Sequence, residues 1–523
     1  MSFIKDLNAP LLRLWPDEFF YAFEAFQHVH ACGGTGSGKT SGSGKMIAGA
    51  YLRAGWGGMV TAAQYAEIGN WENLSAQHGR SRSLVLFDEN EGFNFLSYEM
   101  NRQGAEGVGT ASECLMKVIE AARRATGAGG HQGGEQQFWE DSTRMCLRYS
   151  VLPLYVANGY VSVSDIIRFV SSAPMRREDV TNQAWQAGSF MYEVMDRAAR
   201  RPRVKVSRDA MLGAIEFWSE RWVNTPEKTT GNIVMTVAAV LDRFLHGRLK
   251  KAFCGKTTIV PEMSLLGCVI VLAMPTLTWF EDGVIAQTLF KYMWQRAVLG
   301  RNALAEVYRE RPVFLFSDES QETVSSYDGE FLSTCRQSLC AVTFMTQSLP
   351  AYYQKIGGNN PRDDAHALVG KFQTHVYHSN ACPETNEYAA KMIGRVITRQ
   401  NSYSDASSTN YNAGMSAGES ENSGSNSNWG YSSGGGGFGT NSSSGSNSGK
   451  GNNWGSNRGR GTSESVTHGY SEHMEYAIEP GAFARTLLTG GKRNGGLVTA
   501  VWFKSGRIFK GTGSNRMLVR FRQ

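Results

Sequence analysis

Residues 33–40 read GGTGSGKT, and this octapeptide decides the fold of the chain. It fits the phosphate-binding pattern G-x-x-x-x-G-K-[ST]. Its glycines let successive backbone N–H groups turn toward phosphate oxygens, where a Cβ atom would obstruct the turn. Residues 26–31 read as a short strand and residues 40–52 as a helix, which is the strand–loop–helix context that the motif requires.

This loop predicts a site for ATP and Mg²⁺. Lys39 supplies a positive charge for the β- and γ-phosphates, and Thr40 offers a hydroxyl to the metal. A chance match in a chain with 59 glycines is the alternative, and the flanking strand and helix weigh against it. A second GSGK at residues 42–45 lacks the first glycine and has Met46 where Ser or Thr belongs, so we assign it to the helix. The residues expected to hold the nucleotide are Gly33, Thr35, Gly36, Ser37, Gly38, Lys39, Thr40 and Ser41.

Composition indicates a multidomain protein of the cytoplasm. The 523 residues suffice for about two or three domains, and a formal charge of +6 permits an anionic partner without requiring one. The eight cysteines form no C-x-x-C pair, which favours reduced thiols over zinc or a disulfide framework. The N-terminus carries acidic residues and proline where a signal peptide needs an apolar run. The best apolar stretch, residues 265–275, falls short of the ~20 residues of a membrane span, so we expect no transmembrane segment.

Strand and helix patterns divide the chain into sheet-forming and helical parts. Apolar strands alternate with helices before about residue 105 and again after residue 250, which implies a parallel sheet covered on both faces. Helical periodicity without strands fills about 110–248 and suggests an inserted helical domain, with a helix start at Ser164 and Asp165. Strands are predicted at 57–64, 83–88, 268–275, 312–320, 341–348 and 374–379. The predicted domains are the first part of an α/β core at 1–105, an all-helical insertion at 106–250, the second part of the core at 251–400, a low-complexity linker at 401–465 and a C-terminal β-rich segment at 466–523.

The low-complexity linker consists mainly of Gly, Ser and Asn. Such a stretch buries too little apolar surface to offset the entropy lost on ordering, so we expect a spacer. Beyond it, residues 497–511 and 517–523 alternate apolar and polar with a period of two around a Ser505–Gly506 turn. This pattern predicts a terminal β-hairpin.

A second motif follows the strand VFLFS, whose next residues are Asp318 and Glu319. In phosphate-loop folds an acid at the end of a neighbouring strand holds Mg²⁺, and a second acid beside it can polarise the attacking water. We therefore assign Asp318 to the metal and Glu319 to general-base catalysis. An exposed acidic turn is the alternative, and the phosphate loop upstream weighs against it.

Two further residues complete the predicted catalytic set. Gln347 ends the strand predicted at 341–348, where a polar side chain could lie beside the γ-phosphate and report hydrolysis. Arg336 lies between the two strands and, at a subunit edge, could reach a neighbour's nucleotide as an arginine finger. Spacing alone leaves a plain surface arginine as the alternative.

The ordered set of motifs resembles the coupling-protein ATPases of type IV secretion and conjugation, the TraD/TraG-like proteins of the FtsK–HerA superfamily. The resemblance covers most of residues 20–400 and the C-terminal strands. Besides the loop in its context HACGGTGSGKTSG, it rests on KTTGNIVMTVAAVLDRFL at 228–245, VIVLAMPTLTWFEDGVIAQTLFKYMWQRAV at 269–298, SDES at 317–320, STCRQSLCAVTFMTQS at 333–348 and HSNACPETNEYAAKMIGRV at 378–396.

The resemblance implies a RecA-like phosphate-loop NTPase core with an all-helical insertion and a hexameric ring that binds ATP between neighbours. By position, Lys39 and Thr40 match the family's loop and the acid pair matches its second motif. Arg336 matches the position proposed for the arginine finger, and Gln347 matches the sensor. The sequence departs from the family in lacking two N-terminal membrane helices, and in reading TAAQYAE at 61–67 where a D-P-K-type phrase is usual.

Two segments could contact DNA. The stretch 197–208 carries six basic residues that could meet the phosphate backbone, and a solvated basic linker is the alternative. In the low-complexity linker, aromatic rings near basic residues could stack single-stranded bases, and a plain spacer is the better interpretation there. The basic residues are Arg197, Arg200, Arg201, Arg203, Lys205 and Arg208; the linker residues are Trp429, Tyr431, Phe438, Trp454, Lys450, Arg458 and Arg460.

We therefore predict an ATP-hydrolysing hexameric motor that moves DNA, or a DNA–protein conjugate, in a conjugation-like system. It would reach the cytoplasmic face of the inner membrane through a membrane-bound secretion or relaxosome partner. An ATPase adaptor that recruits protein substrates without pumping DNA is the alternative. A nucleotide kinase fits poorly, because nothing in the sequence resembles an acceptor-binding lid.

Overall fold

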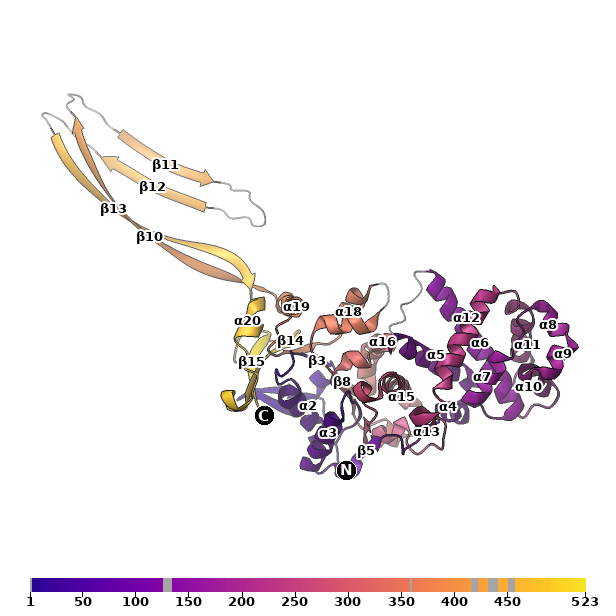
Figure 1. The fold of residues 1–523 in the computed structure, drawn as a ribbon. Helices are drawn as coiled ribbons and strands as arrows, with labels where there is room; N and C mark the ends of the chain where they lie inside the picture. Colours follow the sequence, from indigo (N-terminus) through magenta and orange to yellow (C-terminus); the bar gives the residue numbers. More distant parts are fainter. Residues whose placement is uncertain (1, 126–133, 358–359, 415–421, 431–440, 450–456) are drawn as a thin grey trace. The chain divides into compact units, whose positions relative to one another are not determined.

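The computed structural model describes residues 2–125, 134–357, 360–414, 422–430, 441–449 and 457–523. The chain forms two compact units, one of residues 1–395 with 476–523 and one of residues 396–475 (Figure 1). The first unit contains the sheet, the helices that cover it and the helical insertion.

Within the described residues, nine strands form one sheet in the order β15-β14-β9-β3-β8-β7-β4-β6-β5. The strands from β9 to β5 run parallel, and the last two strands of the chain add an antiparallel edge beside β9. The predicted terminal hairpin is therefore present and extends the sheet. The strands are β3 (Val29–Cys32), β4 (Gly57–Thr61), β5 (Leu84–Phe87), β6 (Val269–Leu272), β7 (Val313–Ser317), β8 (Cys340–Thr346), β9 (Thr374–Tyr377), β14 (Leu497–Lys504) and β15 (Arg516–Arg522).

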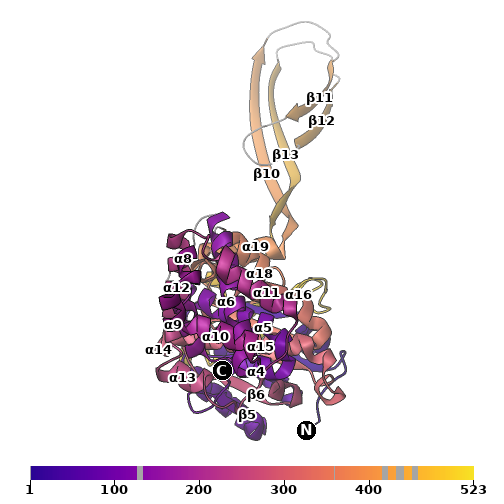
Figure 2. The same cartoon turned by 90° about the vertical axis from the view of Figure 1, so that its right-hand side faces the viewer.

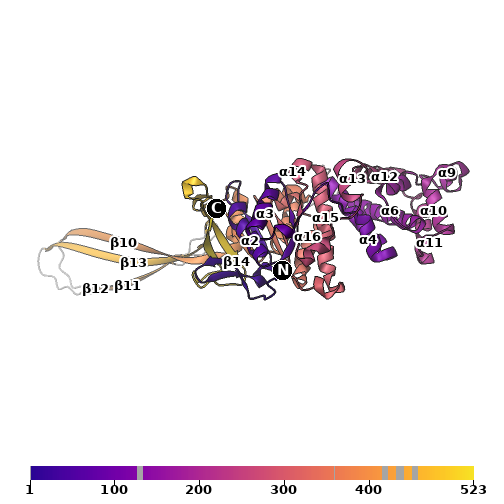
Figure 3. The same cartoon turned by 90° about the horizontal axis from the view of Figure 1, so that it is seen from below.

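The central strands are apolar throughout because helices cover both faces of the sheet. Phe314 and Phe316 of β7 face α2 (Lys45–Arg53) and α3 (Tyr65–Gln77), whereas Val313 and Leu315 face α15 (Glu281–Leu299) and α17 (Leu349–Ile356). Figure 3 shows the α2–α3 pair and α15 around the sheet. This arrangement confirms the α/β class with a mostly parallel sheet. Other helices of this unit are α1 (Ala22–Ala25), α14 (Thr276–Trp279), α16 (Ser326–Thr334), α18 (Pro361–Val369), α19 (Pro383–Ile393) and α20 (Pro480–Arg485), and a separate hairpin consists of β1 (Pro10–Trp15) and β2 (Glu18–Tyr21).

The segment between β5 and β6 is helical, as the sequence predicts (Figure 2). Buried side chains of α5 and α6 join those of α15 in one continuous hydrophobic cluster, so the insertion shares a core with the sheet-covering helices. The helix predicted to start at Ser164 and Asp165 begins slightly earlier, because Ser162 Oγ accepts a hydrogen bond from the Asp165 backbone at 3.1 Å and caps α7. The helices are α4 (Phe95–Gln103), α5 (Gly107–Ala125), α6 (Gly134–Asn158), α7 (Val163–Ser171), α8 (Arg177–Thr181), α9 (Gln183–Gly188), α10 (Phe190–Arg200), α11 (Arg208–Glu216), α12 (Glu227–Asp242) and α13 (Gly247–Phe253).

The second unit contains strands where we expected a spacer without regular structure. β10 (Arg395–Gly414) pairs with β13 (Asn457–Tyr476), and β11 (Asn422–Gly430) pairs antiparallel with β12 (Asn441–Gly449). The physical reason is that strand pairing joins main-chain groups and needs no apolar side chains. Of the predicted stacking set, Trp429, Arg458 and Arg460 fall in β11 and β13. Tyr431, Phe438, Lys450 and Trp454 lie outside the described residues.

Candidate functional site

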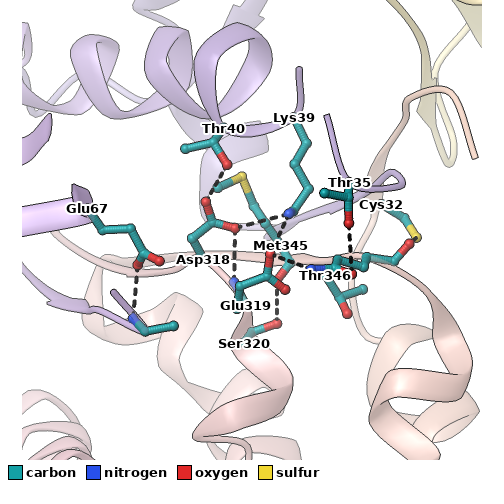
Figure 4. Close-up of polar contacts among 12 residues, drawn as sticks. Cys32, Thr35, Lys39, Thr40, Glu67, Asp318, Glu319, Ser320, Met345 and Thr346 are labelled. Carbon is teal, nitrogen blue, oxygen red and sulfur yellow. Dashed lines mark hydrogen bonds and ion pairs between the residues drawn. The ribbon is translucent and has the colours of Figure 1, made fainter. Parts of the chain in front are cut away.

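The carboxyl ends of β3, β7 and β8 bring the phosphate loop and the acid pair together (Figure 4). Parallel strands end at the same edge of a sheet, and ligands of open α/β sheets bind at that edge. Lys39 Nζ lies 2.7 Å from Glu319 Oε1 and 3.6 Å from Asp318 Oδ1. Thr40 Oγ1 donates a hydrogen bond to Asp318 Oδ2 at 2.5 Å. Residues 278 to 280 positions apart in the sequence thus share one site.

Glu319 is held by side chains from three elements. Its backbone is left-handed, with φ of 46° and ψ of 48°, which is unusual for a residue with a Cβ and is typical of functional sites. Besides the ion pair with Lys39, its carboxylate accepts hydrogen bonds from Gln347 Nε2 at 3.2 Å and from Gln321 Nε2 at 2.8 Å. The orientation of this carboxylate is therefore fixed on both oxygens.

Gln347 bridges the acid pair and the phosphate loop. Its Nε2 donates to Glu319, and its Oε1 accepts a hydrogen bond from Thr35 Oγ1 at 3.3 Å. Sequence spacing placed Gln347 beside the expected γ-phosphate, and the structure puts it between the loop and the predicted base.

Burial and charge act in opposite directions at this site. Burial disfavours the charged form of Lys39, which is 7% exposed, but the carboxylates of Asp318 and Glu319 outweigh this effect and raise the pKa of Lys39. Burial would likewise raise the pKa of Glu319, but the charge of Lys39 and the hydrogen bonds from Gln321 and Gln347 lower it. Both groups are therefore ionised at neutral pH.

The loop itself leaves no room for larger residues at two glycines. A Cβ on Gly33 would lie 2.5 Å from Ser37 Oγ and 2.6 Å from His378 Cβ. Gly38 has a left-handed φ of 84°, and a Cβ there would lie 2.5 Å from Val498 Cγ2. Glycine at these two positions thus answers a steric requirement of the fold.

A cavity of about 550 Å³ opens on the loop. Its wall includes residues of the loop, of α2 and of α3, and buried Phe316 and Met345 form its floor. Most residues expected to hold the nucleotide line it, namely Gly36, Ser37, Gly38, Lys39, Thr40 and Ser41. Gly33 and Thr35 belong to the same loop, and Thr35 points to Gln347 rather than into the cavity wall.

Two polar residues of the site escaped the sequence analysis. Gln321 Oε1 accepts a hydrogen bond from Thr346 Oγ1 at 2.9 Å, so Gln321 ties Glu319 to β8. Glu67 at the start of α3 accepts a hydrogen bond from the Ala63 backbone at 3.0 Å, and burial together with the charge of Asp318 raises its pKa to about 8. The only available signal for Glu67 was its place after the second strand, in the TAAQYAE segment.

Arg336 lies away from this cluster. It precedes β8, whereas Lys39 follows β3, which runs parallel to β8. The two residues thus lie at opposite ends of strands, and β8 alone spans about 20 Å at ~3.3 Å per residue. Arg336 is exposed. The structure does not bring it to the nucleotide loop of its own chain, and its role as an arginine finger stays a prediction about a neighbouring subunit.

The predicted DNA-contacting stretch covers the end of α10, the loop after it and the first residue of α11. Arg200 pairs with Asp196 at 2.7 Å, and Arg197 lies 3.8 Å from Glu193, so two of its charges are partly offset within the helix. Arg201, Arg203, Lys205 and Arg208 are exposed.

No protein-family profile matches the sequence, and no curated protein sequence matches it. Solved structures do match. A structure of the bacterial conjugative coupling protein TrwBdeltaN70 aligns with 99% of this chain and 89% of its own, at 14% identity and a TM-score of 0.53. The chain has the fold of TrwB. The expected coupling-protein architecture is thereby confirmed at the level of the fold.

Two more distant matches have lower scores than this TrwB structure. TrwB in complex with ADP and Mg²⁺ aligns with 75% of this chain and 79% of its own, at 15% identity and a TM-score of 0.47. VirB4 of Thermoanaerobacter pseudethanolicus aligns with 75% and 89%, at 10% identity and a TM-score of 0.44. None of the helices that the structure describes is both long and apolar enough to span a membrane.

Proposed function

We propose that the chain is an ATPase whose site consists of the phosphate loop, Asp318, Glu319 and Gln347. The observation that carries this proposal is the convergence of Lys39, Thr40 and the acid pair at one edge of the sheet. A structural ion pair needs only one acid and one base. Here the glycine loop, Lys39 and Thr40 line a cavity, and two acids and an amide contact that lysine, that hydroxyl and each other beside it, which suits a triphosphate.

The residues present fit Mg²⁺ as well as ATP. The Thr40 hydroxyl and the Asp318 carboxylate are oxygen ligands on one side of the site, and Mg²⁺ prefers oxygen ligands. When bound, the metal would offset the negative charge of the phosphate oxygens. Lys39 would hold the β- and γ-phosphates. Glu319, ionised and oriented by two amides, would accept a proton from the attacking water, and Gln347 would report the change to Thr35 in the loop.

We further propose that the protein is a hexameric motor that moves DNA or a DNA–protein conjugate in a conjugation-like system. The fold shared with a conjugative coupling protein supports this assignment. The exposed Arg336 at the opposite edge of the sheet is available to a neighbour's nucleotide in a ring. The motor would work in the cytoplasm and reach the cytoplasmic face of the inner membrane through a membrane-bound secretion or relaxosome partner.

The ATP site is tested by changing Lys39 and a lysine that lies away from the cavity. Lys39→Ala should lower ATP turnover by about 10²- to 10³-fold, because the main positive charge on the phosphates is lost. Lys251→Ala is the control, since Lys251 is exposed on α13 and lies outside the cavity wall, and its turnover should stay within about threefold of the wild type. Normal turnover by Lys39→Ala would exclude this site.

DNA stimulation of the ATPase separates the motor from the adaptor. A motor should respond strongly to DNA at low salt and lose the response as salt rises, because phosphate contacts release counterions. Replacing Arg201, Arg203 and Lys205 by alanine should reduce the part of the DNA stimulation that depends on salt. An ATPase that ignores single- and double-stranded DNA but retains a protein substrate in a pull-down would favour the adaptor.

A further inference from the structure

The last two strands of the chain lie directly against the phosphate loop. A Cβ atom added to Gly38 would lie 2.5 Å from Val498 of β14. A Cβ atom added to Gly42 would lie 3.2 Å from Val498 and 3.4 Å from Phe521 of β15. These contacts join residues more than 400 positions apart in the sequence. The hairpin of β14 and β15 therefore packs against the phosphate loop and also forms one edge of the sheet.

Gln523 connects the phosphate loop to a second glycine-rich loop. Its Nε2 donates a hydrogen bond to Ser41 Oγ at 2.7 Å, and its Oε1 accepts one from the Gly491 backbone at 2.9 Å. Its own backbone N–H donates to Gly496 O at 2.9 Å. The Gln523 side chain thus lies between Ser41 and Gly491 and forms a hydrogen bond with each.

This second loop, residues 490–496, reads GGKRNGG and is basic. All four of its glycines have left-handed φ values between 59° and 82°, and the Gly496 N–H donates to Gly491 O at 2.9 Å, which closes the loop on itself. A Cβ on Gly490 would lie 2.4 Å from Gln523 Oε1, so the Gln523 amide fits against the loop backbone. Lys492 and Arg493 lie exposed in the middle of the loop.

The position of Ser41 indicates which part of a nucleotide this loop would meet. Lys39, Glu319 and Gln347 mark the end of the site where the γ-phosphate belongs. Loops of this type cradle the α- and β-phosphates with their backbone N–H groups, and Ser41 follows Thr40 on the helix side of that cradle. The Gln523–Gly491 contact therefore places the second loop beside the α-phosphate and the ribose rather than beside the reacting phosphate.

We propose that residues 490–496 form a second nucleotide-binding loop, in which Lys492 and Arg493 contact the α-phosphate and ribose of a nucleoside di- or triphosphate. This inference rests on the proposed ATP site and assigns it a positively charged outer wall. Because these contacts lie away from the γ-phosphate, the loop supplies binding affinity and leaves the chemical step to Glu319.

The test compares three ligands, ATP, ADP and pyrophosphate, whose Kd values are measured by calorimetry on the full chain with Mg²⁺. In the double variant Lys492→Ala/Arg493→Ala, we expect Kd for ATP and ADP to rise about fivefold or more, because charge-assisted contacts are lost. Kd for pyrophosphate, which lacks the nucleoside, should stay unchanged. Lys510→Ala is the matched control, since Lys510 is an exposed lysine in the loop at the other end of the same hairpin.

Gln523→Ala provides a second variant that keeps both basic residues. It removes the side chain between Ser41 and Gly491, and we expect a smaller rise in Kd for ATP with an unchanged unfolding midpoint. Equal ATP affinity in the double variant and in Lys510→Ala would overturn the proposal. An equal loss of pyrophosphate affinity would also overturn it, because it would show a general attraction for anions. A wild-type chain that binds no ATP would reject the proposed ATP site itself, and the wild-type titration alone would show this.

Discussion

Ionisable side chains near the two ends of the parallel strands differ in charge. The ends at which the strands finish form the carboxyl edge, and the ends at which they begin form the amino edge. At the carboxyl edge, buried Lys39 and half-buried Glu319 carry opposite charges and form an ion pair. At the amino edge, His30 and His375 lie opposite each other on β3 and β9, with ring centroids 5.7 Å apart, and no acid pairs with either among the described residues. Lys39 and Glu319 are therefore charged, whereas the two histidines, which lack an acidic partner, are neutral.

The largest effect is expected from the carboxyl edge, at Glu319. Glu319→Gln keeps the shape of the side chain but removes the proton acceptor, so kcat for ATP hydrolysis should fall by about 10³-fold. ATP affinity should remain near that of the wild type. Steady-state turnover and a Kd measurement check both expectations. Glu322→Gln is the control, since Glu322 lies three residues further on and pairs with Lys355. Near-normal turnover by Glu319→Gln would remove the general-base assignment.

Arg336 is the one predicted catalytic group at the amino edge, and it should act only between subunits. Arg336→Ala should lower turnover of the assembled protein by about 10²-fold or more without changing ATP affinity. Mixing it with the Lys39→Ala variant should restore part of the activity, because each subunit supplies what its neighbour lacks. Arg309→Ala, an exposed arginine elsewhere, is the control. Unchanged turnover, or a loss that mixing never restores, would contradict the assignment of Arg336 as a finger.

Much of the carboxyl edge could be predicted because its signals are local in the sequence. The loop at 33–40 and the acid pair after VFLFS each sit beside an apolar strand, and parallel strands must end at one edge. Strand ends follow less directly from the sequence. The strand predicted to reach Gln64 stops at Thr61, where the backbone turns toward α3. Patterns of burial mark the middle of a strand better than its end.

The missed residues have functions that depend on tertiary contacts. Gln321 is an ordinary glutamine in the sequence, and only the approach of β8 shows that it joins Glu319 to Thr346. Gln523 likewise gains its place from a contact with Ser41 across 482 positions. The strands at 422–449 were not predicted because main-chain pairing leaves no apolar pattern in a stretch of Gly, Ser and Asn.

The two neutral histidines of β3 and β9 predict a loss of stability in acid. Burial lowers the pKa of His375 to about 4, with a further decrease from Lys504, and burial also lowers the pKa of His30 well below its usual value. In the unfolded chain each histidine binds a proton near pH 6.5, whereas in the folded chain it stays neutral to lower pH. The stability that depends on these neutral histidines is therefore fully present above about pH 6.5 and is lost as the pH falls toward 4. The free energy of unfolding should decrease by ~1.4 kcal/mol per pH unit for each such histidine.

Urea unfolding between pH 7.5 and 5 measures this dependence. His375→Gln should flatten it, because the variant has one group fewer to protonate on unfolding. His246→Gln changes an exposed histidine and should leave the dependence unaltered. Identical pH profiles for the wild type and His375→Gln would show that the amino edge does not hold a neutral histidine there.

The smallest effect is expected at Gln321, which acts at the carboxyl edge through Glu319. Gln321→Ala removes one of the two amide hydrogen bonds on the Glu319 carboxylate, and Lys39 and Gln347 remain. A misdirected base should lower kcat by about fivefold, because a single hydrogen bond contributes ~1 kcal/mol. The KM for ATP should not change, since Gln321 is absent from the wall of the cavity. A rise in KM with constant kcat would instead mean that Gln321 shapes the nucleotide site. Gln321 would then belong with the groups that bind the phosphates and not with the amides that orient Glu319.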